Sequence, residues 1–176
     1  MTAEKNGAFR HTYDSPIGKL RLTGDGAGLT GLAFAEGAPD GGDFGGEAPV
    51  LGETIRWLDL YFAGEAPGFT PLLRPGGTAF CRRVWNILQT IPRGGTMTYG
   101  EVAREAARRM GVPRMSAQAV GGALGRNPIL LIIPCHRVVG AGGAPVGYRG
   151  GLARKAWLLA LEREGAPGGP EDQGKG

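Results

Sequence analysis

The sequence predicts an α+β protein in which a small N-terminal α/β domain with an antiparallel sheet precedes a mainly helical C-terminal domain. Segments between residues 11 and 37 alternate apolar with small or polar side chains, which is typical of strands. From residue 78 onward, apolar residues recur at helical spacing instead. Residues 64–77 hold four glycines and three prolines, the composition of an extended linker. We therefore expect one domain with its linker over 1–77, a second over 78–164 and a disordered tail over 165–176.

The N-terminal elements follow from local patterns. Residues 19–23 and 29–34 are predicted strands, and the Gly24-Asp25-Gly26 cluster between them predicts the turn of a hairpin. Residues 49–64 form a predicted helix. Its apolar side chains follow the spacing of one helix face: Leu51, Ile55, Leu58 and Phe62.

Composition excludes several protein classes. The 34 glycines and 13 prolines make up roughly a quarter of the 176 residues, near the range of low-complexity chains, but 41% apolar and 20% charged residues are typical of a globular protein. Apolar runs fall well short of the ~18 residues of a membrane span. The N-terminus lacks the apolar stretch of a secretory signal, and two cysteines exclude a disulfide scaffold. We expect a cytoplasmic protein without membrane association.

Charge is distributed unevenly along the chain. Residues 1–79 hold 6 basic against 10 acidic side chains, whereas residues 80–164 hold 13 basic, nearly all arginine, against 4 acidic. This asymmetry favours a polyanionic partner such as nucleic acid, because guanidinium groups fit phosphates. An arginine-rich solvated face is the alternative.

Two helices joined by a break follow the predicted helix over 78–90. Thr98 and Glu101 form a capping-box pattern that begins a helix ending near Met110. After the Gly111-Val112-Pro113 break, Ser116 is a predicted cap for a second helix ending near Gly125. The pair is a candidate helix-turn-helix in a winged-helix-like domain, with two simply packed helices as the alternative.

The second of these helices has almost only small side chains, in the run Ala117-Gln118-Ala119-Val120-Gly121-Gly122-Ala123-Leu124-Gly125. Glycine costs a helix interior about 1 kcal/mol relative to alanine, so the composition needs a reason. Either the helix packs tightly against a neighbour, or its backbone approaches a nucleic-acid groove. Few of its side chains could recognise base edges, so DNA binding would have little sequence preference.

An apolar run over residues 129–133 predicts a buried strand that leads into Pro134, Cys135 and His136. A neighbouring imidazole can take the proton of a thiol and activate it as a nucleophile. Adjacent strand residues point to opposite faces, so the pair needs a turn, plausible at Pro134, or a bridging water. A buried structural cysteine is the alternative. A zinc site is poorly supported because the chain has only two cysteines and two histidines.

Together these motifs resemble the O6-alkylguanine-DNA alkyltransferase family. The resemblance covers residues 78–164 closely and the N-terminal part only through Ser15-Pro16-Ile17-Gly18. It rests on motifs in the family order: Thr98-Tyr99-Gly100-Glu101-Val102-Ala103, Ala119-Val120-Gly121-Gly122-Ala123, Asn127-Pro128, Pro134-Cys135-His136-Arg137-Val138, Gly147-Tyr148-Arg149-Gly150-Gly151-Leu152, and Lys155-Ala156-Trp157-Leu158-Leu159 with Glu162.

The resemblance implies a role for each reactive residue. Cys135 would accept the alkyl group, His136 would act as its base through a water, and Glu162 would orient the imidazole, as in other nucleophile–base–acid triads. Tyr99 would donate a hydrogen bond or proton to the guanine.

Further residues would shape the pocket. Asn127 would hold the turn that carries Cys135, and Lys155 would stabilise charge. The substrate-binding residues would be Tyr148, Arg149, Val138, Gly147 and Pro134.

The same resemblance implies that the second helix enters the minor groove of double-stranded DNA and that the damaged base is flipped out of the duplex. The DNA-binding residues would be Gln118, Ala119, Gly121, Gly122, Ala123, Arg126 and Arg137. Gln118 departs from the family, which usually has an arginine there to fill the space of the extruded base.

The function so implied is direct-reversal DNA repair. A monomer without cofactor or metal would transfer the alkyl group irreversibly from O6-alkylguanine to Cys135, with O4-alkylthymine as a second candidate substrate. The main alternative is a non-catalytic protein that recognises alkyl damage, although such relatives lack the acceptor cysteine. A helix-turn-helix regulator and a Cys-His hydrolase are further alternatives.

Overall fold

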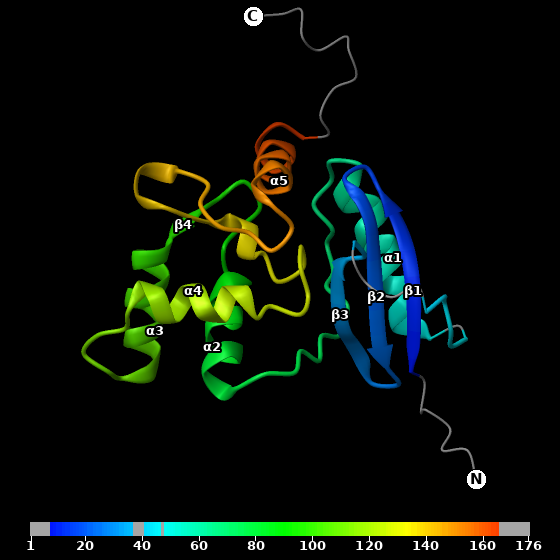
Figure 1. Cartoon of the computed structure of the whole chain (residues 1–176), viewed down its shortest axis with the longest axis horizontal. Coiled ribbons are helices and arrows are strands. Elements are labelled where there is room, and N and C mark those ends of the chain that lie inside the picture. The colour runs from blue at the N-terminus through cyan, green and yellow to red at the C-terminus, as the bar shows by residue number, and fades with distance from the viewer. Residues whose placement is uncertain (1–7, 37–40, 47, 166–176) are drawn as a thin grey trace, which may run out of the picture.

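The computed structural model describes residues 8–36, 41–46 and 48–165. A sheet with one helix lies on one side of the molecule and a group of helices on the other (Figure 1), so the predicted α+β class is confirmed. Of the expected C-terminal tail, residues 166–176 lie outside the described residues.

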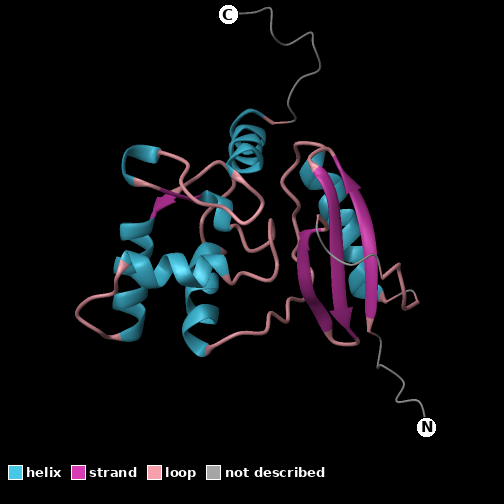
Figure 2. Ribbon diagram, in the orientation of Figure 1, coloured by secondary structure: helices cyan, strands magenta, loops and turns pink. Residues whose placement is uncertain are grey.

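The N-terminal part is a three-stranded antiparallel sheet in the order β1 (Phe9–Ser15), β2 (Gly18–Asp25) and β3 (Gly28–Phe34). Asp25 closes the β2–β3 turn, because its Oδ1 atom accepts the backbone N–H groups of Ala27 and Gly28 at 2.9 and 3.0 Å. The single helix α1 (Pro49–Phe62) packs against this sheet (Figure 2). The predicted hairpin and helix are thus confirmed.

The C-terminal part contains α2 (Ala79–Leu88), α3 (Tyr99–Met110), α4 (Ala117–Gly125) and α5 (Leu152–Glu164). Two short strands, β4 (Met97–Thr98) and β5 (Val138–Val139), pair in parallel. Three-residue 3₁₀ turns occur at η1 (Cys135–Arg137) and η2 (Ala141–Gly143).

Capping residues define the helix-turn-helix as the sequence predicts. Both hydrogen bonds of the Thr98–Glu101 capping box are present, and the Ser116 hydroxyl accepts the backbone N–H of Ala119 at 3.0 Å. Gly111 ends α3 in the left-handed conformation, with φ 65°, which glycine adopts without strain. Helices α3 and α4 pack against each other and against α2.

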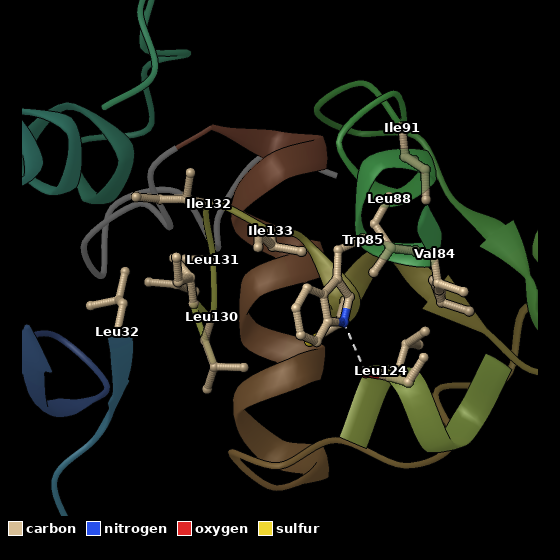
Figure 3. Packing of buried hydrophobic residues seen from close by; sticks show 14 of the residues in the cluster. Leu32, Val84, Trp85, Leu88, Ile91, Leu124, Leu130, Leu131, Ile132 and Ile133 are labelled. Carbon is tan, nitrogen blue, oxygen red and sulfur yellow. Dashed lines mark hydrogen bonds between the residues drawn. The ribbon is translucent and has the colours of Figure 1, made fainter. Parts of the chain in front are cut away.

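The apolar run over residues 129–133 is not the predicted strand. It forms successive buried turns, with one bridge between Ile129 and Leu32 of β3 and a left-handed backbone at Leu131 (φ 71°). The run lies between Leu32 and Trp85 of α2 (Figure 3), so it is apolar because both sides are covered. A short apolar run indicates burial but does not distinguish a strand from buried turns.

The two parts of the chain are in direct contact. Arg154 of α5 donates from Nε to the Ile17 carbonyl at 2.8 Å and pairs with Glu36. The rings of Phe62 and Trp157 lie 6.1 Å apart, so α1 also reaches α5. Within the described residues, no helix is long and apolar enough to cross a membrane.

Candidate active site

Cys135 lies at the start of η1 and lines a cavity of about 300 Å³. Only 4% of the residue is exposed, so the thiol is reached through this cavity. The remaining lining residues come from α3, α4 and the segment before α5: Tyr99, Gly121, Leu124, Gly125, Gly147, Tyr148 and Arg149. Leu124 and Gly125 were not predicted. Their spacing of three and four residues from Gly121 places them on the same helix face, a signal the sequence does contain.

Asn127 holds the turn that carries Cys135. Its Nδ2 atom donates to the Ile133 carbonyl at 2.8 Å, and its Oδ1 atom accepts the Ile129 N–H at 2.9 Å. The same Ile133 carbonyl accepts the backbone N–H of Cys135 at 2.8 Å. Asn127 is fully buried, so its amide satisfies backbone groups that water cannot reach.

His136 and Glu162 form a buried pair behind the nucleophile. His136 Nε2 lies 2.6 Å from Glu162 Oε1. The exposed fraction is 0% for the His136 side chain and 1% for that of Glu162. An ionised carboxylate only accepts, so Nε2 carries the proton and Nδ1 keeps its lone pair. This Nδ1 atom is buried and has no hydrogen-bond partner among the described residues. The arrangement gives a neutral imidazole whose free nitrogen can act as a base.

Glu162 also binds residues that the sequence did not assign to it. Arg137 donates from Nε to Oε2 at 2.8 Å and from Nη2 to Oε1 at 2.9 Å, and its Nη1 donates to the Ile91 carbonyl at 2.7 Å. The Tyr61 hydroxyl of α1 donates to Oε1 at 2.8 Å. Arg137 was predicted to bind DNA, but the ion pair turns its guanidinium inward, so that assignment is corrected.

Burial and charge set the protonation states of the site. Burial raises the pKa of the Cys135 thiol, although the hydrogen bond with Asn127 and the Lys155 charge act in the opposite direction. Burial also lowers the pKa of His136 below its ordinary 6.5. Burial opposes ionisation of Glu162, but the hydrogen bonds and charges of His136 and Arg137 outweigh it and lower its pKa. At neutral pH the thiol and the imidazole are therefore both neutral, and attack requires proton transfer between them.

Lys155 and Tyr99 both bind the segment that runs from β5 to the start of α5. Lys155 is fully buried, and its Nζ atom donates to the carbonyls of Val138, Gly147 and Val146 at 2.5, 3.0 and 3.2 Å. The Tyr99 hydroxyl donates to the Val146 carbonyl at 2.9 Å. Both side chains therefore hold one wall of the cavity. Within the described residues, no group of three or more His, Cys, Asp or Glu side chains could hold a metal ion.

The predicted substrate-binding residues separate into two groups. Gly147, Tyr148 and Arg149 line the cavity, and Arg149 Nη1 also donates to the Asn127 carbonyl at 2.7 Å. Val138 is buried in the core, and Pro134 lines a different cavity, so these two assignments are corrected.

The predicted DNA-binding residues of α4 also face different ways. Gln118 and Gly122 are exposed, Ala119 and Gly121 are half-buried, and Arg126 is exposed just after the helix. Ala123 is fully buried, and its carbonyl accepts the Trp85 indole N–H at 2.9 Å, so its assignment to DNA is corrected. The helix has an inner face as well as an outer one.

The outer glycines of α4 are not required by packing within the molecule. A Cβ atom added to Gly121 would come no closer than 3.9 Å to Tyr99, and one added to Gly122 no closer than 3.7 Å to Arg126. Both are ordinary van der Waals distances. Packing against a neighbouring helix, the alternative raised by the sequence, therefore does not account for them.

Comparison with known proteins gives a consistent result over both parts of the chain. The family model described as the DNA binding domain of 6-O-methylguanine DNA methyltransferase matches residues 79–164, and the model of its ribonuclease-like domain matches residues 8–73. The methylated-DNA–protein-cysteine methyltransferase of Mycobacterium bovis is 46% identical, covering 89% of this chain and 93% of that protein. The protein of the same name from Methanosarcina acetivorans is 45% identical, covering 85% and 95%.

A solved structure shares the architecture as well. The crystal structure of Mycobacterium tuberculosis OGT in complex with DNA has a TM-score of 0.75 and 45% identity, covering 89% of this chain and 93% of that one. The family models, the curated relatives and the shared fold all point to one family. The chain therefore belongs to the 6-O-methylguanine DNA methyltransferase family.

Proposed function

We propose that this protein repairs alkylated DNA by direct reversal, transferring the alkyl group from the O6 atom of guanine irreversibly to Cys135. The observation that carries the proposal is the position of the Cys135 thiol, which lines a cavity beside α4 and has the His136–Glu162 pair behind it. The family relationship supports the same chemistry. O4-alkylthymine is a second candidate substrate, proposed from the resemblance alone.

In the proposed reaction the thiol proton passes through a water to His136 Nδ1, and the sulfur attacks the alkyl carbon. The new S–C bond forms as the C–O6 bond breaks, and the electron pair remains on the guanine. Tyr99 would supply a hydrogen bond or proton to that base, exchanging its bond with the Val146 carbonyl for one with the substrate. The stable thioether ends the activity, so each molecule acts once.

DNA would be bound through α4 in the minor groove, by a monomer and with little sequence preference. The outer glycines support this mode, because their small size is unexplained by internal packing and permits close approach of the helix backbone. The substrate base would be flipped into the cavity. Gln118, exposed on the second residue of α4, would enter the space of the extruded base.

We propose that residues 1–77 and 78–164 are the two domains, with the reaction carried by the second. A location in the cytoplasm remains a prediction of the sequence. No observation favours the non-catalytic alternative, since the acceptor thiol and its proposed base are both present.

Incubation with duplex DNA containing O6-methylguanine, followed by intact mass measurement, tests the proposal. We expect a stoichiometric gain of about 14 Da, one methyl group replacing a hydrogen on sulfur. Cys135→Ala should abolish the gain, whereas Cys81→Ala, which removes the other buried thiol, should retain it. Bound DNA with an unmodified protein would support the non-catalytic alternative.

A further inference from the structure

Tyr61 brings a side chain of the N-terminal part into the reactive centre. It lies on α1, 101 residues before Glu162 in the sequence, and its hydroxyl donates to Glu162 Oε1 at 2.8 Å. The ring is held in place by stacking on Trp57, with centroids 5.0 Å apart, and by an edge contact with Phe62 at 5.3 Å. Tyr61 is 1% exposed, so this hydrogen bond is shielded from water.

Three donors meet at one carboxylate oxygen. Glu162 Oε1 accepts from the Tyr61 hydroxyl, from His136 Nε2 and from Arg137 Nη2. A hydrogen bond to an ionised group in a buried site is stronger than one between neutral groups. Burial and the charge of Glu162 raise the pKa of Tyr61, so the hydroxyl stays protonated and remains a donor.

We propose that Tyr61 is a positioning residue for the alkyl transfer, through which α1 sets the orientation and basicity of the His136–Glu162 pair. The inference rests on the proposed function, because His136 is the base of that reaction. The N-terminal part of the chain thereby completes the reactive centre as well as supporting the fold.

Tyr61 and His136 share Glu162 Oε1, and this determines the direction in which loss of the Tyr61 hydroxyl changes the pKa of His136. Without the Tyr61 hydroxyl, the negative charge of Glu162 is less neutralised, so it holds the Nε2 proton more strongly and favours the imidazolium. The pKa of His136 should therefore rise. The other ionisable groups around the pair are unchanged by this variant: Arg137 and Cys135 of η1, Lys155 of α5, Arg93 after α2, and Tyr148 before α5.

Tyr61→Phe keeps the ring and its stacking while removing the hydroxyl. We expect the acid limb of the single-turnover rate to move up by about one pH unit, the scale of one hydrogen bond to a charged group. The chain has only two histidines, His11 and His136, so ¹⁵N-histidine NMR can follow the imidazole directly. The same upward shift is expected in that titration, with the affinity for undamaged duplex unchanged.

Tyr13→Phe is the matched control, since the Tyr13 hydroxyl donates to Asp59 at 2.6 Å on the same part of the chain. Tyr13→Phe should change neither the acid limb of the single-turnover rate nor the NMR titration of His136. An unshifted His136 titration in Tyr61→Phe, even with a lower thermal midpoint or a slower rate, would overturn the proposal. If the wild-type protein transfers no methyl group, the proposed function fails instead, whereas the NMR titration still reports on Tyr61.

Discussion

Glu162 Oε1 lies 2.6 Å from His136 Nε2, at a site that excludes solvent from both side chains. The carboxylate fixes which imidazole nitrogen carries the proton and leaves the other available as a base. It also balances the charge of Arg137. One side chain thus supports both the chemistry and the folded state.

Glu162→Gln should slow the alkyl transfer and also destabilise the folded protein. An amide cannot balance the Arg137 charge and can donate to Nε2, which favours the wrong tautomer. We expect a transfer rate lower by roughly 10²- to 10⁴-fold and an unfolding free energy lower by about 3 kcal/mol. Single-turnover kinetics and denaturant unfolding measure the two effects. Glu164→Gln, an exposed substitution on the same helix, should change neither.

The transfer rate should depend on pH through His136. Because burial lowers the pKa of His136 below 6.5, the base stays neutral at pH 7, and the rate should fall only at pH values below 6.5. The pKa of His136 is lower in the folded protein than in the unfolded chain. The stability that the neutral, buried imidazole contributes above pH 6.5 is therefore lost as the pH falls through the folded-state pKa. Rate and thermal midpoint measured over roughly pH 5 to 8 check this prediction. An acid limb above pH 6.5 would contradict it.

Asn127→Ala should loosen the turn that carries the nucleophile. The Ile133 carbonyl and the Ile129 N–H would lose their side-chain partner in a buried site. We expect a loss of about 2–4 kcal/mol in unfolding free energy together with slower transfer. Asn86→Ala, on an exposed position of α2, is the control for loss of an asparagine. Equal stability of the two variants would refute the assigned role.

Lys155→Met should release the cavity wall. The Nζ atom binds three carbonyls of residues 138–147, and methionine fills similar space without donating to any of them. We expect a loss of about 3 kcal/mol in stability and faster hydrogen exchange in that loop. Lys19→Met, whose side chain is 71% exposed, should leave exchange there unchanged. Unaltered protection of the loop in Lys155→Met would count against the prediction.

Gln118→Arg should tighten binding to duplex DNA. The guanidinium adds a charge for phosphate and a planar group that stacks in the space of the extruded base. We expect an affinity roughly three- to tenfold higher at fixed salt. Gln118→Lys separates the two contributions, because it adds the charge without the planar group. If neither affinity nor transfer rate changes in Gln118→Arg, the glutamine does not limit base flipping.

Local patterns in the sequence were sufficient for most of the element boundaries. Thr98 with Glu101, Ser116 and Gly111 act through contacts within a few residues, so their effect on helix ends is visible without the fold. The Cys135–His136 pair and its need for a turn were also predictable, and the structure supplies that turn at η1. Resemblance to a family added Glu162, whose position near a helix end carries no chemical signal by itself.

Tertiary structure decided what depends on distant segments. Leu32 and Trp85 cover the run of residues 129–133 from two sides, which explains why it is apolar. An apolar run of this length does not distinguish buried turns from a strand. Arg137 and Ala123 face inward because Glu162 and the Trp85 indole offer buried partners there. The Tyr61–Glu162 bond joins residues 101 positions apart. Such contacts form only when burial brings the segments together, so the sequence alone specified the reactive groups and the fold decided their partners.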